Sequence, residues 1–278
     1  MTFNPTRCIV RNEDCDLHYW HQGRGPLIVF IPGGNGHGRQ YDPIMAALSD
    51  DGYTCATFDR RQMSASQVAR PRRLHPPQQA RDVRAVVAAL GFEKAVLFGS
   101  SAGGVIAFQF ALDFPDAVEH IIAHEAPTVL LLPDAGEVFD FLYRLQEVYE
   151  TEGVAAAAGG FREALLGYDD AGVPATVAPE AANRENFWAN EFLVLTCYVP
   201  SLHRLRENGT SVGLMRGVRS RDAFFARAVE EQAKILGCLK FDVPGHHEGF
   251  QVELDAFLPY FVRMLEALED RRRGKSSV

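Results

Sequence analysis

The strongest chemical signal in the chain is a serine that stands between small residues. Ser101 lies in the segment Gly99-Ser100-Ser101-Ala102-Gly103, a G-x-S-x-G pattern. An apolar run typical of a buried strand precedes it and a helical pattern follows it, which is the context of a nucleophile elbow. The tight turn would expose the Ser101 hydroxyl, and the N–H of Ala102 at the helix start could stabilise an oxyanion. The structural alternative is a glycine-rich turn with a helix-capping serine.

A second oxyanion donor is expected from the loop that follows the first buried strand. This loop reads IPGGNGHG over residues 31–38 and contains four glycines, which let the backbone approach a substrate closely. We expect the N–H of Gly34 or Asn35 to donate there. A phosphate-binding loop is disfavoured, because the chain has neither G-x-x-x-x-G-K-[ST] nor G-x-G-x-x-G.

A serine nucleophile needs a base and an acid, which usually follow it in the order acid, then histidine. The segment Pro244-Gly245-His246-His247-Glu248 comes directly after the last predicted strand. His247 is the expected base, and His246 is the alternative. The expected base would take the proton of Ser101 and return it to the leaving group.

The acid has two candidates in two different loops. Glu125 follows the strand that comes after the nucleophile helix, and Asp222 follows the next strand. The second loop is the commoner place for the acid, but its usual carboxylate position is Ser220, and Asp222 could simply cap the next helix. A carboxylate next to an apolar strand end is costly unless it is paired, which favours Glu125.

The elements that must position these residues alternate between strand and helix. Buried strands are predicted at 27–31, 54–58, 95–98, 118–123, 212–215 and 239–243, after an earlier strand at 17–20. Helices are predicted at 41–49, 76–90, 102–114, 222–236 and 250–268. Strands that alternate with helices predict an α/β fold with a mostly parallel sheet covered on both faces.

The alternation stops between residues 128 and 206, where the pattern is mostly helical. We therefore predict a core domain of residues 1–127 and 207–278, with a helical cap at 128–206. Two aromatic residues of this insertion, Phe187 and Trp188, are candidate substrate contacts, and the alternative is that they form the apolar core of the cap. An insertion after the carboxyl end of a parallel strand is well placed to act as a lid.

Composition excludes several classes of protein. The 278 residues carry 28 basic and 36 acidic side chains, a net charge of −8, which argues against a nucleic-acid surface. Five cysteines without a C-x-x-C pattern disfavour a disulfide framework or a zinc site. No signal peptide and no apolar run of about 18 residues is evident, so a cytoplasmic protein without membrane spans is expected. No cofactor or metal is implied. The sequence leaves the oligomeric state open, and a homodimer is compatible with it.

These motifs resemble the α/β-hydrolases, over residues 17 to about 268. His124-Glu125-x-Pro127, the 99–103 elbow and Pro244-Gly245-x-His247 are similar to the matching segments of the zearalenone lactonases. The resemblance implies that Glu125 is the acid, that His247 is the base and that Gly34 provides the second oxyanion donor. It also implies that Trp188 corresponds to a substrate-contacting tryptophan of the cap. The sequence departs from the lactonases at Ala102 and Gly104 of the elbow, and its cap matches poorly, so their substrate is not carried over.

The predicted function is hydrolysis of carboxylic esters or lactones with a hydrophobic substrate, through an acyl-enzyme on Ser101. A C–C bond hydrolase or a cofactor-free oxygenase would use the same histidine and oxyanion hole. A small-molecule receptor without turnover is a third reading, because fold does not fix function.

Overall fold

The computed structural model describes residues 3–176 and 178–276. Its centre is an eight-stranded sheet with the strand order β1-β2-β4-β3-β5-β6-β7-β8. The two pairs that involve β2 are antiparallel and all the other pairs are parallel. The strands are β1 (Thr6–Asn12), β2 (Cys15–Gly23), β3 (Leu27–Ile31), β4 (Thr54–Phe58), β5 (Ala95–Ser100), β6 (Val118–His124), β7 (Val212–Gly217) and β8 (Leu239–Val243). The predicted α/β fold with a mostly parallel sheet is confirmed.

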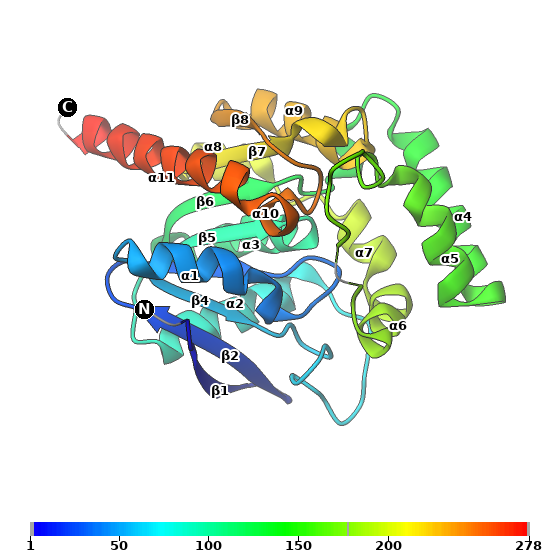
Figure 1. The fold of residues 1–278 in the computed structure, drawn as a ribbon, viewed down its shortest axis with the longest axis horizontal. Helices are drawn as coiled ribbons and strands as arrows, with labels where there is room; N and C mark the ends of the chain where they lie inside the picture. Colours follow the sequence, from blue (N-terminus) through cyan, green and yellow to red (C-terminus); the bar gives the residue numbers. More distant parts are fainter. Residues whose placement is uncertain (1–2, 177, 277–278) are drawn as a thin grey trace.

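Helices cover both faces of this sheet (Figure 1). The helices are α1 (Asp42–Asp50), α2 (Pro76–Ala89), α3 (Ala102–Asp113), α4 (Ala135–Glu152), α5 (Val154–Phe161), α6 (Ala181–Asn190), α7 (Phe192–Cys197), α8 (Leu202–Glu207), α9 (Phe224–Leu236), α10 (Gly249–Val252) and α11 (Leu254–Ser276). Among the described helices, none is both long enough and apolar enough to cross a bilayer.

Burial on both faces explains why the central strands read as continuous apolar runs. Successive side chains of a strand point to opposite faces. In β3, Val29 and Ile31 therefore join the apolar cluster of α2 and α3, whereas Ile28 and Phe30 join the cluster of α1 and α11. Every residue of β3 is buried, so a polar residue on either face would be costly.

Three elements differ from those predicted. The strand β1 was not expected, because it lies at the sheet edge and none of its side chains is fully buried, so it contains no apolar run. The helix expected from residue 222 begins at Phe224, and Asp222 lies in the preceding turn. The helix expected at 250–268 is divided into α10 and α11, and α11 continues to Ser276.

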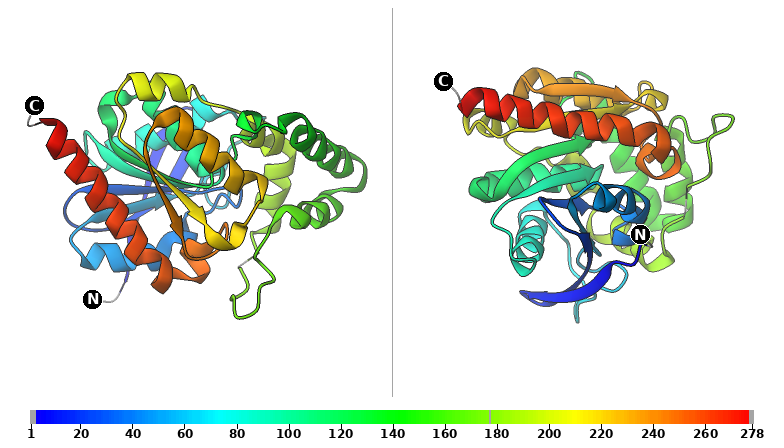
Figure 2. Two further views of the ribbon diagram at one scale, coloured as in Figure 1. Left: turned by 90° about the horizontal axis from the view of Figure 1, so that it is seen from above. Right: turned by 60° about the vertical axis from the view of Figure 1, so that its left-hand side comes forward.

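The helical insertion between β6 and β7 lies beyond the carboxyl ends of the parallel strands, away from both chain termini (Figures 1 and 2). Its helices α4, α5, α6 and α7 share a third apolar cluster with the first turn of α9. Helix α8 differs, because its Leu202 and Leu205 pack in the main core beside α3. The division at residues 128 and 206 remains a prediction.

Candidate active site

The turn between β5 and α3 holds Ser101 in a backbone conformation that few residues adopt. Its φ is 55° and its ψ is −128°. The flanking glycines permit this turn: a Cβ at Gly99 would lie 2.2 Å from the carbonyl oxygen of Gly103, and a Cβ at Gly103 would lie 2.1 Å from that of Ile31. Strained backbone of this kind is found at functional sites, where the surrounding structure maintains it. Glycine is therefore required at positions 99 and 103, because a side chain at either position would clash with a backbone carbonyl oxygen.

The glycine loop after β3 passes directly over this turn. A Cβ at Gly33 would lie 3.1 Å from the Cβ of Ser101, so the loop runs beside the serine. Among the described residues, no hydrogen bond occupies the N–H of Gly34, Asn35 or Ala102. These N–H groups are the predicted oxyanion donors, and they remain available to a substrate oxygen.

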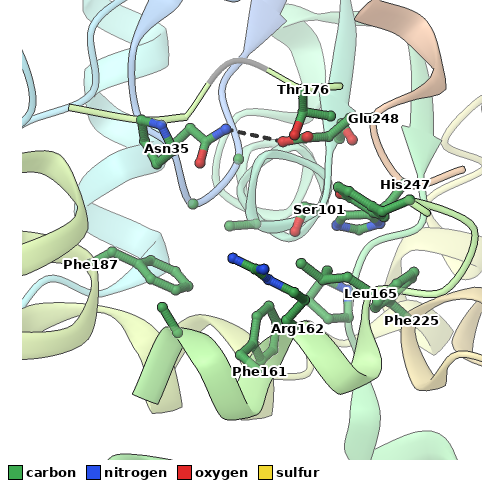
Figure 3. Close-up of a pocket in the computed structure, with 18 of the residues that line it drawn as sticks. Asn35, Ser101, Phe161, Arg162, Leu165, Thr176, Phe187, Phe225, His247 and Glu248 are labelled. Atoms are coloured by element: carbon green, nitrogen blue, oxygen red, sulfur yellow. Dashed lines mark hydrogen bonds between the residues drawn. The ribbon is translucent and has the colours of Figure 1, made fainter. Parts of the chain in front are cut away.

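Glu125 and His247 are in direct contact. The Nδ1 atom of His247 lies 2.8 Å from Oε2 of Glu125, and the carboxylate is completely buried. Because an ionised carboxylate only accepts hydrogen bonds, Nδ1 carries the proton and Nε2 is left as an acceptor. Both Ser101 and His247 line one cavity, and the Ser101 hydroxyl points towards the His247 ring (Figure 3). The ring of Phe225 packs on His247 with 4.0 Å between the ring centroids.

Two further donors hold the carboxylate of Glu125. Oε1 accepts from the N–H of Gly217 at 2.8 Å, and Oε2 accepts from the Ser220 hydroxyl at 3.0 Å. Burial raises the pKa of Glu125, but the hydrogen bonds from His247 and Ser220 and the neighbouring imidazoles lower it to a net value below its ordinary one. Glu125 is therefore ionised at neutral pH.

Neither the alternative acid, Asp222, nor the alternative base, His246, takes part in the contact between Glu125 and His247. Asp222 is exposed, and no hydrogen bond joins it to His247 within the described residues. His246 is buried but does not line the cavity; its ring stacks on Tyr168 at 3.9 Å, and its Nδ1 accepts from the N–H of Glu248 at 3.0 Å. Burial and then the charge of His247 lower the pKa of His246 to about 4. The assignment of catalytic roles among these residues remains a prediction.

The cavity has a volume of about 450 Å³ and is bordered by both the sheet domain and the helical insertion. Phe187 faces it from α6 and contacts Gly34, since a Cβ at that glycine would lie 2.9 Å from the Phe187 ring (Figure 3). Trp188 borders the cavity but is 96% buried among apolar rings, with the Phe192 ring centroid 4.1 Å away. Trp188 therefore packs in the insertion core and contributes only part of its surface to the cavity.

Several residues of the site were not predicted. Glu248 lines the cavity next to His247 and accepts a hydrogen bond from Asn35 Nδ2 at 3.0 Å (Figure 3). Burial raises the pKa of Glu248. The one feature of the sequence that could have indicated Glu248 was its position directly after His247. The cap residue Arg162, which also lines the cavity, had no such signal, because its place depends on how the helices pack.

The described residues contain one cluster of potential metal ligands, and it lies away from the cavity. Among the described residues, the one group of three potential metal ligands is Glu119, His120 and Glu269. It lies at the amino-terminal end of β6, whereas Glu125 follows the opposite end of that strand. Both carboxylates of the group pair with Arg272.

The mostly parallel sheet with helices on both faces has the arrangement of the α/β-hydrolase fold. Residues 26–160 match the family model described as alpha/beta hydrolase fold. A thermophilic esterase from Thermogutta terrifontis superposes with a TM-score of 0.75 over 95% of this chain and 99% of that chain. The sequence identity is 19%, so this likeness concerns the fold.

Two relatives resemble the chain in sequence. An uncharacterised hydrolase of Bacillus subtilis, YraK, is 25% identical over 90% of this chain and 93% of its own length. Zearalenone hydrolase from Bionectria ochroleuca is 31% identical over 41% of this chain and 44% of its own length. The chain thus matches less than half of the zearalenone hydrolase. The predicted resemblance to the α/β-hydrolases and to the zearalenone hydrolases is confirmed.

Proposed function

We propose that the protein is a serine hydrolase that cleaves carboxylic esters or lactones through an acyl-enzyme. The observation that carries the proposal is the 2.8 Å contact between His247 Nδ1 and Glu125 beside the cavity that also contains Ser101. This contact leaves His247 Nε2 as the acceptor for the Ser101 proton, which is the arrangement needed to activate a hydroxyl nucleophile.

In the first half of the reaction, Ser101 Oγ attacks the carbonyl carbon as its proton moves to His247 Nε2. Glu125 remains ionised and stabilises the imidazolium that forms. The N–H groups of Ala102 and of Gly34 or Asn35 stabilise the negatively charged oxygen of the tetrahedral intermediate. His247 then donates its proton to the departing alkoxide, and the acyl group stays on Ser101.

In the second half, a water molecule loses a proton to His247 and attacks the acyl-enzyme. Collapse of the second tetrahedral intermediate returns the proton to Ser101 and releases the acid. With a lactone the alkoxide stays attached to the acyl chain, so the product is one hydroxy acid. The same residues therefore serve both substrate types.

The lining of the cavity supports an apolar acyl chain in the substrate. Phe161, Leu165 and Phe187 face the cavity from the helical insertion, and Phe225 faces it from α9 (Figure 3). Burial of apolar substrate surface against such rings contributes about 25 cal/mol per Å². We accordingly propose that residues 128–206 form a cap whose inner face selects the substrate.

The test is turnover of a panel of 4-nitrophenyl esters, from acetate to octanoate, and of γ- and δ-lactones. The wild-type protein should hydrolyse members of this panel, and Ser101→Ala should lower kcat by about 10⁴- to 10⁶-fold. Circular dichroism would confirm that the variant is folded. Absence of turnover by folded wild-type protein, or unchanged turnover by Ser101→Ala, would contradict the proposal.

A further inference from the structure

Arg162 places a positive charge in the otherwise largely apolar cap side of the cavity. It lies in the short 3-10 helix Arg162–Ala164, which directly follows α5. Its guanidinium group points from the cap into the cavity, on the side where Phe161, Phe187 and Leu165 lie (Figure 3). A substrate bound to Ser101 would occupy the space in front of this group.

Arg162 is exposed and, like Arg184 on α6, borders the cavity without an acidic partner among the described residues, whereas three other arginines near the site are paired. Arg60 pairs with Glu191 at 2.7 Å, and Arg219 pairs with Glu253 at 3.2 Å. Arg221 pairs with Asp170. These three guanidinium groups are thus neutralised, whereas the guanidinium group of Arg162 is open towards the cavity.

The acidic groups of the cavity do not neutralise Arg162. Glu248 lies on the side of His247 and accepts a hydrogen bond from Asn35 at 3.0 Å, so its carboxyl group is engaged there (Figure 3). Asp169 borders the cavity but is exposed, and no ion pair joins it to Arg162 within the described chain. The positive charge of Arg162 is therefore not cancelled by an ion pair with either acidic residue.

A guanidinium group offers five N–H donors in a planar fork that matches the two oxygens of a carboxylate. Such bidentate, charge-assisted hydrogen bonds are among the strongest polar contacts in proteins. A substrate carboxylate near Arg162 would be attracted by the guanidinium charge. Charge therefore orients an acidic substrate with its ionised end towards the cap.

We propose that Arg162 binds a free carboxylate of the substrate, so that the preferred substrates are esters or lactones of an apolar chain that ends in a carboxylate. This proposal rests on the proposed hydrolysis at Ser101 and adds a substrate class to it. Arg184 also borders the cavity and has no acidic partner among the described residues, so the experiment must separate the two arginines.

The experiment compares mono(4-nitrophenyl) esters of glutaric, adipic and suberic acid with the same esters after the free carboxylate is capped as a methyl ester. The readout is the ratio of kcat/KM for the acid to kcat/KM for its capped partner. The wild-type protein should prefer the acid at one chain length. Arg162→Gln should lower that ratio by about 10- to 100-fold, as expected for loss of a charge-assisted hydrogen bond. Arg162→Lys should lower this ratio less, because lysine keeps the positive charge and loses only the planar fork of N–H donors.

Arg144→Gln is the matched control, because Arg144 is exposed on α4 and does not line the cavity. It should leave the ratio unchanged. A ratio that is equal in wild type and Arg162→Gln would overturn the proposal, as would a ratio that falls in Arg184→Gln instead.

A binding measurement separates failure of the proposed carboxylate anchor, Arg162, from failure of the proposed hydrolase function. Monomethyl suberate is titrated by calorimetry into Ser101→Ala and into Ser101→Ala combined with Arg162→Gln. The second protein should bind about 10- to 100-fold more weakly. Equal affinity, or no binding to either protein, would refute the anchor even if esters are hydrolysed. Weaker binding to the double variant would support the anchor even if the panel showed no turnover.

Discussion

The carboxylate of Glu125 is held by three donors, from His247, Ser220 and Gly217. Glu125 directly follows β6. Gly217 is the last residue of the neighbouring strand β7, and Ser220 follows that strand. Because these parallel strands end at the same edge of the sheet, a carboxylate after either strand could reach the histidine. In this protein the carboxylate comes from the loop after β6, and Ser220 in the loop after β7 donates a hydrogen bond to it.

Replacement of Glu125 separates the two candidate acids. Glu125→Gln cannot stabilise the imidazolium and would favour the wrong tautomer of His247, so kcat for a 4-nitrophenyl ester should fall by about 10³- to 10⁴-fold. Asp222→Asn should leave kcat within about twofold, because Asp222 is exposed and is not bonded to His247. If only Asp222→Asn loses activity, the assignment of the acid is wrong.

His124 should make the stability of the protein depend on pH. Burial lowers the pKa of His124 to about 4, whereas an unfolded histidine titrates near pH 6.5. Between these values the unfolded state binds more protons than the folded state, so the free energy of unfolding falls as the pH falls. This effect should amount to about 1 kcal/mol between pH 6 and pH 5.

The measurement is urea unfolding at pH 6.0 and 5.0 of the wild type and of His124→Asn, which keeps a polar group facing Ser100. The loss of stability over this interval should be smaller in the variant by about 1 kcal/mol. His203→Asn, at an exposed position of α8, is the control. Equal losses in wild type and His124→Asn would show that His124 does not cause the dependence.

At the scale of elements, a buried ion pair connects the insertion to the glycine loop of the site. The guanidinium group of Arg60 bonds the Glu191 carboxylate, and its Nη2 also donates to the carbonyl oxygen of Gly33 at 2.8 Å. Both charged side chains are almost completely buried. Arg60 follows β4 and Glu191 lies between α6 and α7, so this contact holds three separate segments together.

Glu191→Gln should therefore destabilise the protein by about 3–5 kcal/mol, because it leaves the Arg60 charge buried without a counter-charge. The matched control is Asp16→Asn, which breaks the exposed pair of Asp16 with Arg11 and should cost less than about 1 kcal/mol. Urea unfolding at pH 7 measures both. Similar small losses in the two variants would mean that the Arg60 charge is compensated in another way.

The central strands were predictable because the core buries them on both faces. The strands 27–31 and 54–58 were predicted with the bounds that the structure has, because their apolar runs are short and end abruptly. The edge strand β1 could not be recognised, since exposed positions place no demand on hydrophobicity. The start of α9 was misplaced by two residues, because the polar residues of the preceding turn also suit a helix.

At the scale of the whole molecule, residues far apart in the sequence meet in one cavity. Motifs placed Ser101, Glu125 and His247 near each other in advance, because each follows a strand of the same parallel sheet. The packing of the insertion decides the rest, including Arg162 and the contact of Phe187 with the glycine loop. Helix packing has no short motif, so these contacts required the structure.

The central claim is that Ser101 is an activated nucleophile. The most direct measurement is reaction of the full chain with a fluorophosphonate, followed by intact-mass analysis and peptide mapping, with Ser101→Ala as the control. We expect a single adduct per chain, on Ser101, and none on the variant. A folded wild-type protein that acquires no adduct over long exposure, or an adduct that persists in Ser101→Ala, would contradict it.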